Sequence, residues 1–188
     1  MLYMLRDIGF AVWFLLPAAC ANAAPIFAAT LPLVKKWTSP IDGGIHLRGR
    51  RLLGAHKTWR GIVSGIVVAT LVLWLQSWLI GHYEWAATLG WAFDYAEAPL
   101  WLLGPLMALG ALGGDALKSF FKRQAGVPDG KPWPPFDQLD YIIGSIVITL
   151  PFAVFPIHIY LWMVGVWTLA HLVSSYIGWI LGLKEGPI

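Results

Sequence analysis

Side chains able to bind a metal ion and phosphate groups are concentrated in one stretch of the sequence, residues 110–144. This stretch joins two strongly apolar segments, and ionisable groups beside a bilayer are costly unless they pair with one another or bind a ligand. Its polar residues are Asp115, Lys118, Ser119, Lys122, Arg123, Asp137 and Asp140. The helical repeat places four of them on one face: Asp115, Lys118, Ser119 and Lys122. It places Asp137 and Asp140 one turn apart.

These residue types suit chemistry on phosphates. Mg²⁺ prefers oxygen ligands and is often held by one or two carboxylates together with substrate phosphates. Phosphoryl and nucleotidyl transfer need such ions, and also cations that take up developing charge. Asp115, Asp137 and Asp140 would supply the carboxylates, the lysines and Arg123 the cations, and Ser119 a hydroxyl donor.

Two other interpretations of the same residues remain open. The charges could be structural ion pairs at helix ends. The DxxD pair formed by Asp137 and Asp140 also occurs in prenyl-transfer enzymes, which hold a diphosphate through Mg²⁺. The residues alone therefore indicate an integral membrane enzyme that acts on phosphates through Mg²⁺.

The composition predicts the elements that must position these residues. Of the 188 residues, 58% are hydrophobic and 12% are charged, about half the charged fraction of a soluble domain. A transmembrane helix needs roughly 20 apolar residues, so we expect an all-α polytopic membrane protein with about five transmembrane helices and a single domain, residues 1–188. The apolar segments are residues 8–34, 61–80, 99–123, one beginning near Asp137, and 158–183.

The first segment contains Pro17, Asn22 and Pro25. Residues 15–24 resemble a signal-peptide cleavage region, but the apolar pattern continues to Lys35 and favours a spanning helix. Helices broken by proline persist in membranes where they line a protein cavity. Asn22 is therefore a candidate site residue, although a hydrogen bond between helices is an equal alternative.

The distribution of charge predicts the orientation. All Lys and Arg residues except Arg6 fall within residues 35–60 and 118–131 or at Lys184, whereas residues 81–99 are acidic. The positive-inside rule therefore places two loops, residues 37–60 and 125–136, and the C-terminus in the cytoplasm, and the N-terminus outside the cell membrane. Basic patches beside spans favour anionic lipid or nucleotide phosphate over nucleic acid.

The first of these loops offers further phosphate donors. Lys57, Thr58 and Arg60 lie where the next helix begins, and their side chains suit phosphate oxygens. The spacing of the preceding glycines does not fit a P-loop. We expect the three arginines Arg48, Arg50 and Arg51 only to orient the protein and contact lipid headgroups.

The motifs resemble, in order and rough spacing, those of the CDP-archaeol synthase family, which is related to phosphatidate cytidylyltransferases. The matching segments are PAACANAAP (17–25), PIDGG (40–44), RLLGAHKTWRG (51–61), GDALKSFFKR (114–123), DQLD (137–140), and His171 followed by GLK (182–184). The resemblance implies five transmembrane helices, with both cytoplasmic loops forming the active site. It implies a Mg²⁺-dependent transfer of the cytidylyl group of CTP to a lipid phosphate of the dialkyl or diacyl glycerol type, giving a CDP-lipid and pyrophosphate in phospholipid biosynthesis.

The resemblance also implies roles for individual residues. Asp115, Asp137 and Asp140 would be metal ligands and, with Lys118, catalytic. The residues implied to bind substrate are Asn22 in the polar cavity, Lys57, Thr58 and Arg60 from the first loop, and Ser119, Lys122 and Arg123 from the charged stretch. A membrane prenyltransferase and a non-enzymatic lipid-binding or transport protein are the alternative functions. The glycine pairs Gly61/Gly65 and Gly178/Gly182 suit internal packing and a homodimer equally well.

Overall fold

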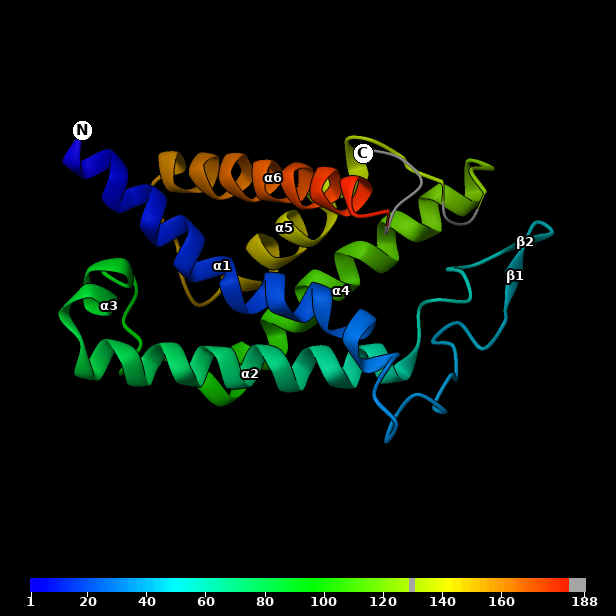
Figure 1. Ribbon diagram of the computed structural model, residues 1–188, viewed down its shortest axis with the longest axis horizontal. Coiled ribbons are helices and arrows are strands. Elements are labelled where there is room, and N and C mark those ends of the chain that lie inside the picture. Colours follow the sequence, from blue (N-terminus) through cyan, green and yellow to red (C-terminus); the bar gives the residue numbers. More distant parts are fainter. Residues whose placement is uncertain (129–130, 183–188) are drawn as a thin grey trace.

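The computed structural model describes residues 1–128 and 131–182, which are almost entirely helical (Figure 1). The elements are α1 (Leu2–Ala28), β1 (His46–Leu47), β2 (Arg50–Arg51), α2 (Trp59–His82), α3 (Glu84–Leu89), α4 (Leu100–Gln124), α5 (Phe136–Thr149) and α6 (Ile157–Ile180). Within the described residues, α1, α2, α4 and α6 are long and apolar enough to cross a membrane. The predicted class, an all-α polytopic membrane protein, is confirmed. Lys184 and the end of the last predicted segment lie outside the described residues.

The fourth predicted span, α5, is shorter than expected. Its 14 residues extend about 21 Å at the helical rise of 1.5 Å per residue, whereas the hydrocarbon core of a bilayer is about 30 Å thick. The apolar pattern predicted where this helix begins but not how soon it ends. It ends at Thr149, just before the turn that contains Pro151 and Pro156.

Helix α1 contains both predicted prolines, Pro17 and Pro25, and continues through them to Ala28. It ends six residues before the predicted boundary at residue 34, because the chain then forms a series of turns. Proline has no amide hydrogen, so Pro17 leaves the carbonyl of Trp13 without its usual donor. The side-chain amide of Gln76 in α2 donates to that carbonyl at 2.7 Å, and both residues are buried. A side chain of α2 therefore supplies the hydrogen-bond donor that the proline in α1 lacks.

Glycines bring the central helices into close contact. On α2, a Cβ at Gly65 would lie 3.2 Å from the carbonyl oxygen of Ala21 in α1, and one at Gly61 would lie 3.2 Å from Pro25. The predicted packing face of this segment is thus confirmed. On α6 the predicted pair is wrong: Gly182 follows the end of the helix with φ +70°, and a Cβ there would meet nothing within 4 Å.

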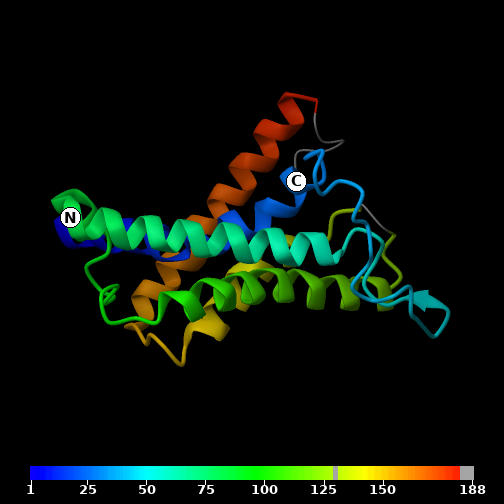
Figure 2. The ribbon, with the colours of Figure 1, turned by 90° about the horizontal axis from the view of Figure 1, so that it is seen from below.

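The two basic loops lie at the same end of the bundle. Figure 1 shows the β1–β2 hairpin and the described part of the α4–α5 loop at one end, and the N-terminus with α3 at the other. Figure 2 shows α2 and α4 running alongside each other while α6 crosses them obliquely. Helix α4 packs against α2 on one side and α5 on another. This arrangement carries the charged end of α4 to the place where both loops meet.

Candidate active site

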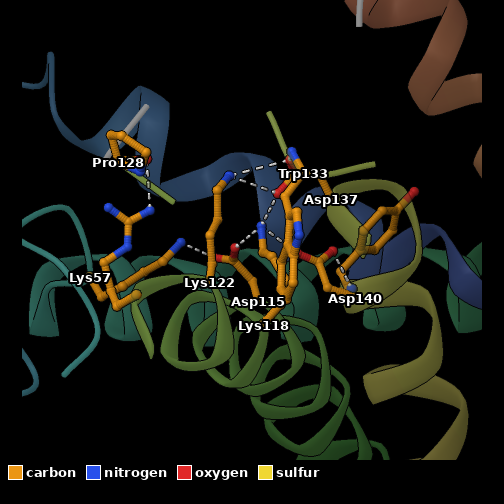
Figure 3. Close-up of polar contacts among 10 residues, drawn as sticks. Lys57, Asp115, Lys118, Lys122, Pro128, Trp133, Asp137 and Asp140 are labelled. Carbon is orange, nitrogen blue, oxygen red and sulfur yellow. Dashed lines mark hydrogen bonds and ion pairs between the residues drawn. The ribbon is translucent and has the colours of Figure 1, made fainter. Parts of the chain in front are cut away.

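Helix α4 presents its charged residues on one face, as its spacing predicted. Asp115, Lys118 and Lys122 point toward the start of α5, which contributes Asp137 and Asp140 (Figure 3). Helix α5 begins at Phe136, with Pro135 at the N-cap position. Asp137 lies in the first turn of this helix, and its carboxylate accepts a hydrogen bond from the amide of Trp133 in the preceding loop. The loop therefore folds back over the acidic helix start.

Lys118 lies at the centre of the cluster. Its Nζ is 3.2 Å from Asp115 Oδ1, 2.8 Å from Asp137 Oδ1 and 2.9 Å from Asp140 Oδ2. The side chains are poorly exposed, at 14% for Lys118 and 3% for Asp140. One ammonium group thus holds together three carboxylates that would otherwise repel one another across a partly buried site.

Lys122 and the loop complete the surroundings of Asp137. The Lys122 Nζ lies 3.4 Å from both carboxylate oxygens of Asp137, and Lys122 is itself buried. Burial would raise the pKa of Asp137, but hydrogen bonds from Lys118 and the Trp133 amide, with the charges of both lysines, hold that pKa below its ordinary value. Asp137 is therefore a carboxylate at neutral pH.

The first loop joins the cluster through Lys57. Its ammonium group pairs with Asp115 Oδ2, on the other side of that carboxylate from Lys118. Lys57 and Asp115 also line a cavity of about 390 Å³ between α1, the first loop, α2 and α4. Of the predicted binding residues, Asn22, Thr58 and Arg60 line the same cavity. Residues separated by almost a hundred positions in the sequence therefore meet, as the resemblance implied.

Some of the lining residues also have structural roles. The Thr58 hydroxyl accepts a hydrogen bond from the Gly61 amide at 3.2 Å and so caps α2. Arg60 donates to the carbonyl of Lys35 at 2.9 Å, which ties the segment that follows α1 to α2. Both residues can therefore shape the cavity as well as contact a ligand.

The structure does not bring two of the predicted residues into the cluster. Ser119 is buried on α4, and none of the described contacts joins it to the carboxylates or to the cavity. Arg123 donates to the carbonyl of Pro128 at 3.1 Å, which supports the second loop. Both residues lie on α4, as predicted. The side chain of Ser119 is buried in the packing of the helix, and that of Arg123 contacts the second loop.

Asp42 is a buried residue to which sequence reasoning gave no function. Its carboxylate accepts hydrogen bonds from Arg51 and from three backbone amides of the first loop. Arg50 donates to the carbonyl of Gln124 at the end of α4. The expectation that Arg50 and Arg51 contact only lipid headgroups is therefore wrong. The available signal was that Asp42 is the one carboxylate within the strongly basic residues 35–60.

The side chains of the cluster include the type of ligand that binds a divalent cation. Three carboxylates converge on one point, and carboxylate oxygens are the ligands that Mg²⁺ favours. That point is taken by the Lys118 ammonium, and among residues 1–128 and 131–182 no group of three His, Cys, Asp or Glu side chains forms a ready-made metal site. A metal would therefore have to share these carboxylates with the lysines.

Comparisons with known proteins agree with this fold. A solved structure described as an intramembrane enzyme for archaeal membrane lipid biosynthesis matches with a TM-score of 0.69 and 30% identity, covering 88% of this chain and 92% of that one. The fold is thus that of a multi-pass membrane enzyme.

The family follows from sequence similarity over nearly the whole length. The family model described as CarS-like, CDP-archaeol synthase, matches residues 4–188. A CDP-archaeol synthase of Thermococcus onnurineus is 33% identical over 184 residues, 97% of this chain and 98% of that protein. One of Methanosarcina barkeri is 37% identical over 158 residues, 79% and 89% of the two chains. The chain belongs to the CDP-archaeol synthase family and is a CTP-using cytidylyltransferase.

Proposed function

We propose that this protein transfers the cytidylyl group of CTP to the phosphate of a dialkyl or diacyl glycerol lipid, giving a CDP-lipid and pyrophosphate. The observation that carries the proposal is the cluster in which Lys57, Lys118 and Lys122 pair with Asp115, Asp137 and Asp140 beside a cavity between apolar helices. Three cations at a membrane enzyme's charged end suit a nucleotide triphosphate, and the surrounding spans suit a lipid co-substrate.

The reaction requires no covalent bond between the protein and the substrates. An oxygen of the lipid phosphate attacks the α-phosphorus of CTP in line, the bond to the β-phosphate oxygen breaks, and pyrophosphate leaves. The attacking oxygen is already anionic, so neither a protein nucleophile nor a general base is required. The protein must position two anions against each other and offset their charge.

The lysines are the residues suited to that task. Lys57 lines the cavity, whereas Lys118 and Lys122 lie deeper, between α4 and α5. We assign Lys57 and Arg60 to phosphate oxygens at the cavity, Lys118 and Lys122 to the charge of the leaving pyrophosphate, and Asn22 and Thr58 to hydrogen bonds at the cavity wall.

Asp115, Asp137 and Asp140 are the residues that would hold Mg²⁺. When bound, Mg²⁺ would offset the charge on the phosphate oxygens and orient them. For the carboxylates to become ligands, Lys57 and Lys118 must leave them, and the phosphates of CTP offer these lysines new partners. The chain's own charges thus favour binding of metal and nucleotide together.

The membrane orientation forms part of the proposal. The basic loops lie at the end of the bundle that carries the cluster, and the positive-inside rule assigns that end to the cytoplasm, where CTP is available. The N-terminus would then lie outside the cell membrane. The proposal does not depend on whether the protein forms a homodimer.

An assay with labelled CTP tests this function. The purified protein in lipid–detergent micelles, with Mg²⁺ and a panel of ether- and ester-linked glycerol lipid phosphates, should form labelled CDP-lipid and release pyrophosphate. Asp115→Asn and Asp140→Asn should each abolish product formation, whereas Asp94→Asn, in the loop at the other end of the molecule, should not. Near-normal turnover in both site variants would contradict the assigned roles. Absence of product with every lipid phosphate, or pyrophosphate release from a prenyl diphosphate without CTP, would contradict the function itself.

A further inference from the structure

The first loop is organised around the buried carboxylate of Asp42. Its side chain has no exposed surface, and its two oxygens accept five hydrogen bonds. The donors are Gly44 N (3.0 Å), Arg51 Nε and Nη2 (both 3.2 Å), Leu53 N (3.1 Å) and Gly54 N (3.4 Å). One carboxylate therefore joins the start of the loop to the strand β2 and to the segment that follows it.

This arrangement determines where the backbone of Lys57 lies. The Ile41 amide, next to Asp42, donates to the Lys57 carbonyl at 2.8 Å, and the Trp59 amide donates to the Ser39 carbonyl at 3.0 Å. Residues 39–41 and 57–59 thus run side by side, with Pro40 and Thr58 bridged between them. The backbone of Lys57 is held by the residue adjacent to Asp42, while its side chain reaches Asp115 on α4.

The far end of the loop is also fixed to α4. Arg50, which pairs with Leu47 in the hairpin, donates to the carbonyl of Gln124, the last residue of α4. Its guanidinium group packs against Gly126, where a Cβ would lie 3.2 Å from the guanidinium nitrogens and where φ is +81°. The loop therefore contacts α4 at both Asp115 and the helix end. Asp42 accepts hydrogen bonds from residues 51–54, which lie in the sequence between these two attachments.

We propose that Asp42 is a positioning residue that holds the first loop in the conformation that presents Lys57 to the nucleotide phosphates. The proposal rests on the function proposed above, because it takes Lys57 to be a phosphate ligand. Asp42 itself lines none of the cavity that Lys57 and Asp115 share. Its effect would therefore be exerted through the loop backbone and not through contact with the substrate.

A carboxylate suits this position better than other side chains of the same size. Five donors converge on it from two sides, and an ionised carboxylate offers about four acceptor sites and no donor. An amide would turn an NH₂ group toward donors, leaving buried amides or the Arg51 guanidinium without an acceptor. Asp42→Asn therefore perturbs the loop while keeping the shape of the side chain.

The test compares Asp42→Asn with Lys57→Met and with the double variant. We expect Asp42→Asn to raise the KM for CTP by about tenfold or more, in line with the strength of hydrogen bonds to charged groups, with a smaller change in the KM for the lipid phosphate. Lys57→Met should do the same, and the double variant should have a KM for CTP within about twofold of Lys57→Met alone. Non-additivity of this kind is expected only when two residues act through one another.

Two further variants separate positioning from general loss of stability. Asp94→Asn is the matched control, because Asp94 also accepts hydrogen bonds from loop amides, those of Ala96 and Glu97, at the other end of the molecule. It should leave the KM for CTP unchanged. Asp42→Glu retains the charge and should give a KM for CTP between those of the wild type and Lys57→Met, which keeps the test available if the Asn variant does not fold.

The outcomes distinguish the proposal from the function on which it rests. A KM for CTP within twofold of wild type in both Asp42 variants would overturn the positioning role, as would additive effects of Asp42→Asn and Lys57→Met. If instead the wild-type protein makes no CDP-lipid from CTP, the proposed function fails, and the KM comparison is then replaced by binding of CTP alone, measured by calorimetry in the same variants. The same non-additive pattern in the CTP dissociation constants would still support the role of Asp42.

Discussion

Replacing Gly114 with alanine should disable the site without removing any functional group. Gly114 precedes Asp115 on α4 and lies against the backbone of α5 at Asp140. A Cβ at this position would overlap the carbonyl oxygen of Asp140 and would lie 2.9 Å from the carbonyl carbon. Backbone atoms cannot rotate aside as the end of a flexible side chain can, so the two helices must separate.

The size of the displacement follows from these contacts. Ordinary carbon–carbon contact is about 3.5–4.0 Å, so α5 must move by roughly 1 Å near Asp140. The carboxylate of that residue lies 2.9 Å from Lys118, and a misplacement of about 1 Å can reduce the rate about 100-fold. Overpacking lowers the free energy of unfolding by about 1–3 kcal/mol. The better helix propensity of alanine offsets up to about 1 kcal/mol of this loss. We therefore expect a folded, slightly destabilised protein with a strongly reduced kcat.

The neighbouring glycine provides the control. A Cβ at Gly113 would meet nothing within 4 Å, so Gly113→Ala makes the same chemical change one residue earlier in the same helix. We expect that variant to retain wild-type kcat and to be more stable by up to about 1 kcal/mol. The assay is CTP-dependent formation of CDP-lipid, together with thermal unfolding in detergent. A kcat for Gly114→Ala within threefold of that for Gly113→Ala would refute the reasoning.

Three other predictions concern charges and hydrogen bonds. Gln76→Leu should lower the free energy of unfolding by about 1–2 kcal/mol, because it leaves the Trp13 carbonyl freed by Pro17 without a donor; unchanged thermal unfolding would contradict this role. Burial would raise the pKa of Asp42, but hydrogen bonds from Arg51 and the loop amides hold it well below its usual range. The resulting stabilisation should be complete above about pH 5 and should decrease as the pH falls below about 4, where the unfolded chain begins to bind the proton. The difference in unfolding midpoint between wild type and Asp42→Asn should therefore shrink between pH 7 and pH 3, and a constant difference would argue against it. Lys118→Met removes the cation shared by three carboxylates, so calorimetry should detect tighter Mg²⁺ binding without nucleotide; equal or weaker binding would show that Lys118 does not compete with the metal.

The sequence predicted the long helices and the charged face of α4 because those signals are local. Apolar length and proline marked the spans, and helical spacing put Asp115, Lys118 and Lys122 on one face. The same spacing failed for Ser119, since a helical face does not say which of two adjacent positions meets the neighbouring helix.

Contacts between distant segments could not be predicted from local patterns. Lys57 and Asp115, which pair in the structure, are 58 positions apart in the sequence. Only the family resemblance predicts that they belong to one site. The sequence does not predict the role of Asp42, because Asp-Gly-Gly is typical of an ordinary turn. The burial of Asp42 depends on how the whole loop folds.

The same ion pairs stabilise the fold and provide the proposed chemistry. A chain of contacts runs from Lys57 in the first loop through Asp115 and Lys118 on α4 to Asp137 on α5. Three aspartates balance three lysines there, which lowers the cost of placing charge between apolar helices. Replacing any one of these residues therefore changes both the stability and the reaction. Gly114 and Asp42 add independent tests, because each controls where a charged residue lies without belonging to the chain of charges.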